Sequence, residues 1–255
     1  MKRLPVLISI VHGGNIIPNE LKERIIIGKK EIFEDIDPFT QQIYDLNEKV
    51  ISIFKTNIAR TFIDLSRSPD DRPPKNPDGV IKSHTCQGKK IYNEHEQPDS
   101  LLIARLLKKY YHPFHYQLKS FIEKNKNLVK LCLDCHSMAE TGPAISPDKG
   151  MKRPIICLGN RYGDSAPNKF VKKLKTCFIN SFELDEQQVS INKPFAGGFI
   201  TRFYGNNPLP WIQVEMNRVL YLKEPYFNST SLKVSNEIIS DLKSKFYFAL
   251  KNFFS

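Results

Sequence analysis

The chain has 255 residues and no Pro/Gly/Ser-rich linker, so we expect a single domain over residues 1–255 with a sizeable core. No stretch approaches 18 consecutive apolar residues, which excludes a transmembrane helix. The net charge of +11 comes from lysines scattered along the chain without a dense basic block or a known nucleic-acid-binding motif, so we expect no nucleic-acid partner.

Two apolar runs are typical of buried strands in a largely parallel sheet, and each leads into a histidine. Leu4–Val11 ends at His12-Gly13-Gly14, and Leu128–Leu133 leads into Asp134-Cys135-His136-Ser137. In open α/β sheets, ligand sites form just beyond the carboxyl ends of strands. Two imidazoles that arrive there from separate strands suit a catalytic metal centre. The pattern therefore predicts a metal-dependent hydrolase.

The other elements follow from periodicity and from turn residues. In chain order we expect a short helix at Pro18–Gly28, a turn at Asp35–Pro38, a helix at Thr40–Phe54, a short strand at Thr61–Leu65, a helix at Leu101–Lys124 with an interruption at Pro113, a strand at Pro154–Gly159, a helix at Lys169–Phe182, a segment from Val189–Ile191, a strand at Trp211–Met216 and a C-terminal amphipathic helix at Ser235–Phe254.

Two polar segments stand between these elements. Ser68–Pro98 is Pro-rich and too long for a simple connection in a compact domain, so we expect an active-site loop or lid there. Ala139–Arg153 is a second loop that directly follows the histidine-bearing strand.

Cysteine usage favours a reducing compartment. The five cysteines are an odd number, and three of them lie in apolar runs, as expected for buried reduced thiols in a cytoplasmic protein. Cys132 and Cys135 form a CxxC, but on a strand they point to opposite faces, and no second pair completes a zinc ribbon.

His12 and His136 are the leading metal ligands. A catalytic zinc site usually adds a carboxylate to its histidines and keeps one position open. The candidates are Asp37, Glu20 and Asp134. Asp134 could instead orient an imidazole, and Asp37 could instead cap the following helix.

Glu215 and two arginines complete the candidate chemistry. A glutamate beside an activated water can take its proton and pass it to the leaving amine, although Glu215 could also form an exposed salt bridge with Arg218. Arg67 and Arg202 can grip a substrate carboxylate, or they can be ordinary surface arginines.

The order and spacing of these motifs are specific when they are taken together, and they run through all but about the last thirty residues. The chain resembles the N-formylglutamate amidohydrolase family through Val11-His12-Gly13-Gly14, Ile63-Asp64-Leu65-Ser66-Arg67, Tyr111-His112-Pro113-Phe114-His115, Asp134-Cys135-His136-Ser137-Met138, Leu158-Gly159-Asn160-Arg161-Tyr162-Gly163, Asn192-Lys193-Pro194-Phe195-Ala196-Gly197-Gly198 and Gln213-Val214-Glu215-Met216-Asn217-Arg218. The family usually has Asn where this chain has Ser66.

The resemblance implies a fold similar to the zinc carboxypeptidases and aspartoacylases. That fold is a three-layer αβα structure with a central mixed, mostly parallel sheet. It also implies one Zn²⁺ ion and hydrolysis of N-formyl-L-glutamate to L-glutamate and formate. The roles it implies are metal binding by His12, Asp37 and His136, proton transfer by Glu215, oxyanion stabilisation by His115 or an arginine, and substrate binding by Arg67, Arg202, Asn192, Gly197 and Gly198.

Two alternatives remain open at this point. The substrate could be another N-acyl amino acid or a small peptide-like amide, or the protein could be a metal-binding homologue without activity. The expected partner is a small anionic N-acyl amino acid, with no membrane partner, and the expected state is a monomer or small homo-oligomer.

Overall fold

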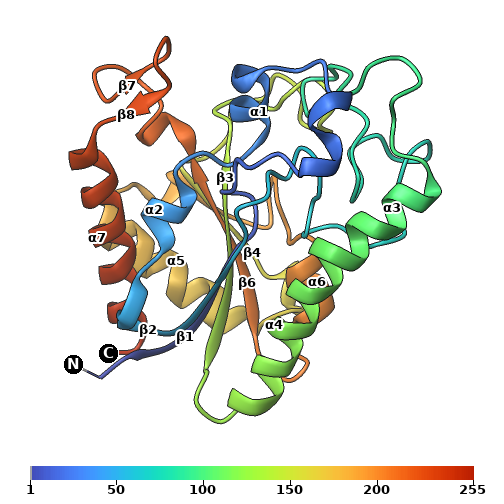
Figure 1. The fold of residues 1–255 in the computed structure, drawn as a ribbon. Coiled ribbons are helices and arrows are strands. Elements are labelled where there is room, and N and C mark those ends of the chain that lie inside the picture. The colour runs from blue at the N-terminus through green and yellow to red at the C-terminus, as the bar shows by residue number, and fades with distance from the viewer. Residues whose placement is uncertain (1) are drawn as a thin grey trace.

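In the computed structural model, residues 2–255 are described, and a six-stranded sheet lies between two layers of helices (Figure 1). The strand order is β2-β1-β3-β6-β4-β5. The first four strands in this order are parallel, whereas β4 runs antiparallel to β6 and β5 is parallel to β4. The strands span Leu4–Ile10 (β1), Val50–Lys55 (β2), Leu131–Met138 (β3), Ile156–Gly159 (β4), Val189–Ile191 (β5) and Trp211–Asn217 (β6).

The helices cover both faces of the sheet. One face packs against Thr40–Tyr44 (α2), Asn168–Phe182 (α5) and Asn236–Phe253 (α7). The other packs against Ser100–Leu106 (α3), His112–Asn125 (α4) and Phe199–Tyr204 (α6). A short helix at Lys29–Asp35 (α1) and a hairpin of Phe227–Asn228 (β7) and Lys233–Val234 (β8) lie beyond one end of the sheet. The expected three-layer αβα fold with a mixed, mostly parallel sheet is confirmed.

The central strands are buried because helices cover the sheet on both sides. Every residue of β3 is buried, and the same holds for β6. Cys132 packs into the core on one face and Cys135 into the core on the other, as the strand period predicts. All five cysteines are free thiols, and Cys86 is half-buried.

The predicted helix at Thr40–Phe54 is wrong in its second half. Helix α2 ends at Tyr44, Asn47 adopts a left-handed φ of 49°, and Val50–Lys55 forms the edge strand β2 beside β1. The apolar residues of this segment fit a helical period, but β-branched and aromatic residues also favour strands. Backbone pairing with β1 decided between the two.

Two other expectations need correction. Thr61–Leu65 forms turns and not a strand, because its apolar side chains enter the core while its backbone stays outside the sheet. The predicted interruption at Pro113 is a π-helical turn at Leu107–Tyr111, through which α3 continues into α4. Pro113 lies just after this π-helical turn, so the departure from i→i−4 hydrogen bonding coincides with the residue that lacks an N–H.

The histidine-bearing strand extends further than predicted. Strand β3 runs to Met138, so His136 lies within it and not after it, and its backbone pairs with Glu215 of β6. The expected helix at Pro18–Gly28 is a 3₁₀ helix at Asn19–Arg24. Helices α1 and α6 and the β7–β8 hairpin were not expected from the sequence.

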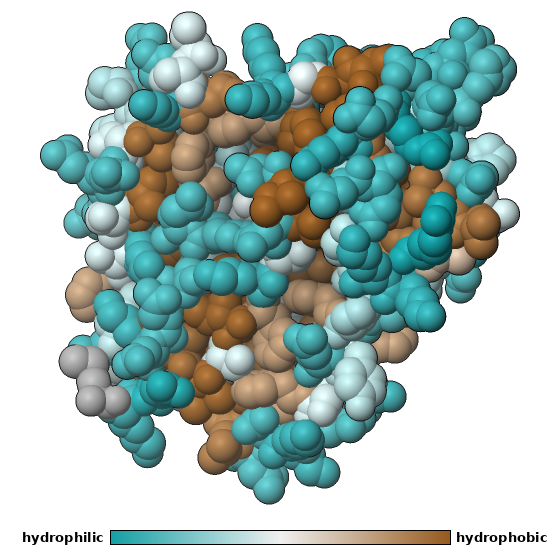
Figure 2. Space-filling view, in the orientation of Figure 1, coloured by the Kyte–Doolittle hydropathy of each residue, from teal (hydrophilic) through white to brown (hydrophobic). Residues whose placement is uncertain are grey.

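In Figure 2 hydrophilic side chains are interspersed with apolar ones across the visible face. Within residues 2–255, no helix is both long and apolar enough to cross a membrane.

Candidate active site

A cavity of about 880 Å³ opens at the carboxyl ends of β1, β3 and β6. These are neighbouring parallel strands, so side chains at their ends meet at one edge of the sheet. Around them the cavity is lined by the segment before α2, by the long loop after Arg60, by the loop after β3 and by the segment that precedes α6.

The turn after β1 carries His12 into this cavity. Gly14 follows it where the chain passes the backbone of Asn57, and a Cβ atom at Gly14 would lie 2.4 Å from the Asn57 carbonyl carbon. A larger residue would push the turn away, so the glycine is needed to bring His12 to this position.

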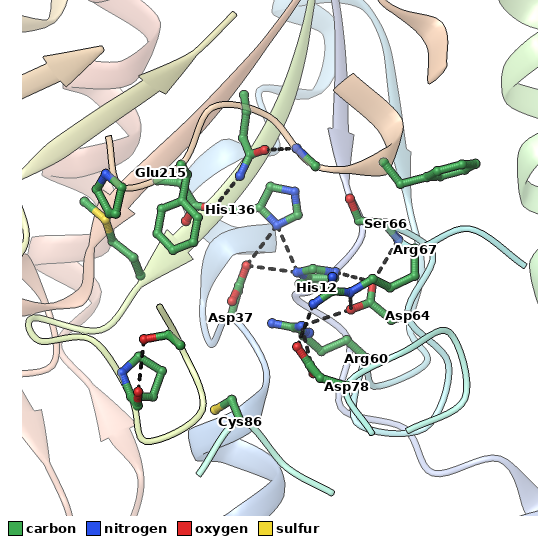
Figure 3. A pocket seen from close by; sticks show the side chains of 18 of the residues that line it. His12, Asp37, Arg60, Asp64, Ser66, Arg67, Asp78, Cys86, His136 and Glu215 are labelled. Carbon is green, nitrogen blue, oxygen red and sulfur yellow. Dashed lines mark hydrogen bonds and ion pairs between the residues drawn. The ribbon is translucent and has the colours of Figure 1, made fainter. Parts of the chain in front are cut away.

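Three potential ligand atoms meet at the cavity floor (Figure 3). The Nδ1 atoms of His12 and His136 are 2.9 Å apart. The Oδ2 atom of Asp37 is 3.2 Å from Nδ1 of His136 and 3.5 Å from Nδ1 of His12. Ligand atoms of a tetrahedral zinc ion are separated by about 3.3 Å when the metal–ligand bonds are about 2.0 Å. All three residues are buried, and the donor set fits such an ion with one position open.

A second carboxylate lies at the far nitrogen of each imidazole. Asp64 Oδ1 is 2.7 Å from His12 Nε2, and Asp134 Oδ1 is 3.1 Å from His136 Nε2. A carboxylate at Nε2 favours a proton there and leaves the lone pair on Nδ1, which faces the cluster. Asp134 therefore lies where the alternative role in orienting an imidazole requires it.

Arg218 holds Asp37 in place. Its guanidinium donates to Asp37 Oδ1 at 2.9 Å and to the Ile36 carbonyl at 2.6 Å, and its Nε donates to Ser137 Oγ at 3.0 Å. Arg218 thus pairs with Asp37 and not with Glu215, and the alternative salt bridge is wrong. The alternative capping role of Asp37 is also wrong, because Phe39 is the N-cap of α2 and no side chain caps that helix.

The electrostatics of the cluster favour a positive charge at its centre. Burial alone would raise the pKa of Asp37, but hydrogen bonds and charge from His12, His136 and Arg218 hold it well below its usual value. Burial would lower the pKa of His136, but the charges of Asp134, Asp37 and Glu215 raise it well above its usual value. A divalent cation would supply that positive charge.

Glu215 stands beside this cluster on β6. It is buried, and Gln213 Nε2 donates to its Oε1 at 2.6 Å. Burial raises the pKa of Glu215 to about 6, although the positive charge of His136 opposes the increase. A carboxylate with a pKa near neutrality can both accept and return a proton.

The model of one protein family matches this chain. It is the family of N-formylglutamate amidohydrolases, and the match covers residues 4–222. The chain belongs to this family. It is therefore a hydrolase that acts on an amide. No curated protein matches the chain.

Solved structures agree with this fold. The chain is similar to an N-formylglutamate amidohydrolase from Ralstonia eutropha JMP134, with a TM-score of 0.78 and 18% identity over 98% of this chain and 93% of that one. It is also similar to a protein from Agrobacterium tumefaciens, with a TM-score of 0.68 and 15% identity over 98% of this chain and 89% of that one. These identities support the shared fold only.

The two arginines predicted to bind substrate have different surroundings from each other. Both line the cavity. Arg67 Nη2 donates to Asp78 at 2.6 Å, and Asp64 and Asp71 lie within 4.0 Å of the same guanidinium. Arg202, on α6, is exposed and has no carboxylate partner within residues 2–255. The guanidinium of Arg67 is thus already paired with carboxylates of the protein itself.

The glycines expected at the substrate site also line the cavity. Gly197 has a φ of 133°, and Gly198 precedes α6, where its backbone N–H donates to Gln213. Asn192 lies behind them and exchanges hydrogen bonds with Asn160, at 2.9 and 2.8 Å. Asn192 is therefore placed to support the cavity wall, since it does not line the cavity itself.

Two further candidates lie away from the cluster. His115 does not line the cavity, and its ring nitrogens are 3.0 Å from the Leu65 carbonyl and 3.0 Å from the Tyr204 hydroxyl. Both nitrogens are used, so His115 has no free donor to offer an oxyanion. Glu20 pairs with Lys109 at 2.6 Å and is not part of the His-Asp-His cluster.

The Ser68–Pro98 segment forms one wall of the cavity. Lys82, with a fully buried side chain, lies 2.9 Å from Asp35 and 2.7 Å from Asp78. Val80 and Ile81, which directly precede Lys82, are buried as well. The prediction of a long loop at the site is confirmed. Its buried ionic anchors favour a fixed wall over a hinged lid.

Sequence reasoning missed three functional positions in this site. Asp64 and Arg218 each stand inside a quoted motif, but no role followed from the motif alone. Arg60, which pairs with Asp64 at 2.9 Å, stands just before the same motif. Charged residues embedded in apolar stretches were the available signal, because a buried charge needs a partner.

Proposed function

We propose that this protein is a zinc-dependent hydrolase that cleaves N-formyl-L-glutamate into L-glutamate and formate. The observation that carries the proposal is the convergence of two imidazole nitrogens and one carboxylate oxygen within 3.5 Å of one another. Membership of the amidohydrolase family supports the reaction type. Nitrogen and oxygen donors at these separations suit Zn²⁺.

His12, Asp37 and His136 would hold the ion, with Asp64, Asp134 and Arg218 orienting them. When bound, the ion supplies polarisation of the amide carbonyl and greater acidity of a nearby water molecule.

Glu215 moves the proton. Its carboxylate takes a proton from the attacking water as the water oxygen bonds to the formyl carbon. It then delivers that proton to the amide nitrogen as the C–N bond breaks. The other product is formic acid, whose O–H proton passes to solvent as formate leaves. The buried position of Glu215 and its pKa of about 6 suit both directions of transfer.

A second substrate class is favoured by the size of the cavity. N-formyl-L-glutamate has about a dozen non-hydrogen atoms and would fill only part of a cavity of about 880 Å³. A longer acyl group on the same amino acid would also fit.

The test is formate release from N-formyl-L-glutamate by purified protein that is first stripped with a chelator and then reloaded. We expect activity to disappear on chelation and to return with Zn²⁺. N-acetyl- and N-propionyl-L-glutamate are assayed in parallel by release of L-glutamate. Activity on these substrates alone would mean that the acyl group of the substrate is acetyl or propionyl and not formyl. Activity that survives complete zinc removal would overturn the metal requirement.

A further inference from the structure

Six arginines line the cavity, and they fall into two groups. Four pair with carboxylates: Arg60 with Asp64, Arg67 with Asp78, Arg153 with Asp148 and Arg218 with Asp37. Arg161 and Arg202 have no carboxylate within 4.0 Å in the described part of the chain. Only these two present uncompensated positive charge to a ligand.

The uncompensated charge matters because the wall around Arg67, the acidic wall, carries three carboxylates. Arg67 stands among Asp64, Asp71 and Asp78, and the nearby Lys82 is shared between Asp78 and Asp35. A substrate carboxylate that approached Arg67 would have to displace an existing ion pair and would meet three like charges. Arg161 and Arg202 impose neither cost.

The backbone around Arg161 is built to hold it in position. Arg161 and Tyr162 adopt left-handed φ values of 51° and 59°, which are unfavourable for residues other than glycine. The N–H of Arg161 donates to the Ala196 carbonyl at 2.8 Å. Hydrogen bonds between Asn160 and Asn192 hold the start of this turn. Such an arrangement persists only where its surroundings impose it.

The Gly197–Gly198 turn adjoins both arginines. A Cβ atom at Gly197 would lie 2.8 Å from Cγ of Arg161 and 2.9 Å from Cγ2 of Thr201, the residue before Arg202. Arg161 also donates from its guanidinium to the Gly197 carbonyl at 3.3 Å, which leaves most of its donors free. The Arg161 stem thus contacts Gly197, while Arg202 joins the same turn through its backbone, since its N–H donates to the Gly198 carbonyl at 3.0 Å.

We infer that Arg161 is a substrate-binding residue that acts with Arg202, and that this pair selects substrates whose amino-acid part carries two carboxylates. The inference rests on the proposed function for the identity of the reaction. It assigns to Arg161 the substrate-binding role that the sequence motif suggested for Arg67. Arg67 instead forms an ion pair with Asp78 in the acidic wall.

The first measurement is binding, because it does not depend on catalysis. Glutarate, a five-carbon dicarboxylate, and glutaramate, its monoamide, are titrated into the purified zinc-loaded protein by calorimetry. We expect the wild type to prefer glutarate by tenfold or more. Arg161→Met, which keeps an apolar stem over Gly197, and Arg202→Met should each reduce that preference to less than threefold. Arg161→Lys should retain part of it.

Arg105 provides the matched control. It is exposed on α3, outside the cavity, so Arg105→Met should bind both compounds as the wild type does. A wild type without preference for glutarate, or an Arg161→Met protein that retains the full preference, overturns the inference. Thermal unfolding of each variant verifies that the folded protein is being compared.

The second measurement separates this inference from the proposed reaction. With N-formyl-L-glutamate, Arg161→Met should raise KM tenfold or more while kcat stays within threefold. If the wild type hydrolyses no N-acyl glutamate but Arg161→Met still abolishes the glutarate preference, the proposed reaction fails and the binding role stands. A fall in kcat at unchanged KM and an intact glutarate preference would contradict the binding role.

Discussion

The two sides of the cavity hold their charged side chains in different ways. On one side, His12, Asp64, Arg60, Asp78 and Lys82 form a continuous series of contacts, and the Lys82 side chain has no exposed surface. On the other side, Arg161 and Arg202 have no carboxylate partner within residues 2–255.

The contrast between paired and unpaired charges separates two tasks within one cavity. A buried charge must be paired for the fold to tolerate it, so a paired side chain serves rigidity and chemistry at a defined place. An unpaired guanidinium in water costs little and stays available for an anion. We therefore expect damage to the paired side to reduce kcat or stability, and damage to the unpaired side to change KM.

The largest effect is expected at Glu215. Glu215→Gln removes the proposed proton carrier but keeps the size of the side chain beside His136, so kcat should fall by roughly 10²–10⁴-fold. The zinc content, measured by atomic absorption, should match that of the wild type, and KM should change little. Activity within tenfold of the wild type would remove Glu215 from the proposed mechanism.

The next effect concerns the buried cation of the acidic wall. Lys82→Met leaves Asp35 and Asp78 without their shared partner, which should lower the free energy of unfolding by about 3–5 kcal/mol. Lys89→Met is the control, because Lys89 pairs with Glu31 while 54% of its side chain is exposed, and it should cost at most about 1 kcal/mol. Urea unfolding measures both. Equal losses would mean that the wall is not anchored through Lys82.

The third effect is a pH dependence at His115, which supports the Leu65 backbone next to Arg67. Burial lowers the pKa of His115 to about 4, from an unfolded value near 6.5. The neutral ring is thus favoured in the folded state. Its contribution is complete above about pH 6.5, and as the pH falls toward 4 about 3 kcal/mol of it is lost.

His115→Gln should therefore flatten the fall in unfolding free energy between pH 6.5 and 4.5. The control is His95→Gln, because the His95 side chain is 92% exposed and its replacement should leave the wild-type slope unchanged. Urea unfolding at the two pH values gives each slope. If His115→Gln keeps the full wild-type slope, another titrating group causes the pH dependence of the unfolding free energy.

The smallest effect is expected at Arg67. Arg67→Met removes one of three cations around Asp78, and since the Arg67 side chain is 35% exposed the unfolding free energy should fall by only about 1 kcal/mol. Glutarate affinity should stay within threefold of the wild type. A tenfold loss of glutarate affinity in Arg67→Met, with Arg161→Met unaffected, would reverse the roles of the two sides.

Features of the molecule that depend on local pattern could be predicted from the amino-acid sequence. The apolar runs before His12 and around His136 predicted two central parallel strands, and the loop at Ser68–Pro98 followed from its polar, Pro-rich composition. The motifs also indicated the amidohydrolase family, which the family match confirms. Hydrophobic period and motif order are properties of neighbouring residues, so they can be read along the chain.

Features that depend on residues far apart in the chain became visible in the folded protein alone. Val50–Lys55 became a strand because β1 was available to pair with it. Asp37 faced the two imidazoles because Arg218, 181 residues later, holds its other oxygen. Arg67 and Arg161 look alike in sequence, yet Asp78 pairs with the first and no carboxylate of the described chain pairs with the second. Pairing of charges is a three-dimensional property, and sequence spacing alone does not contain it.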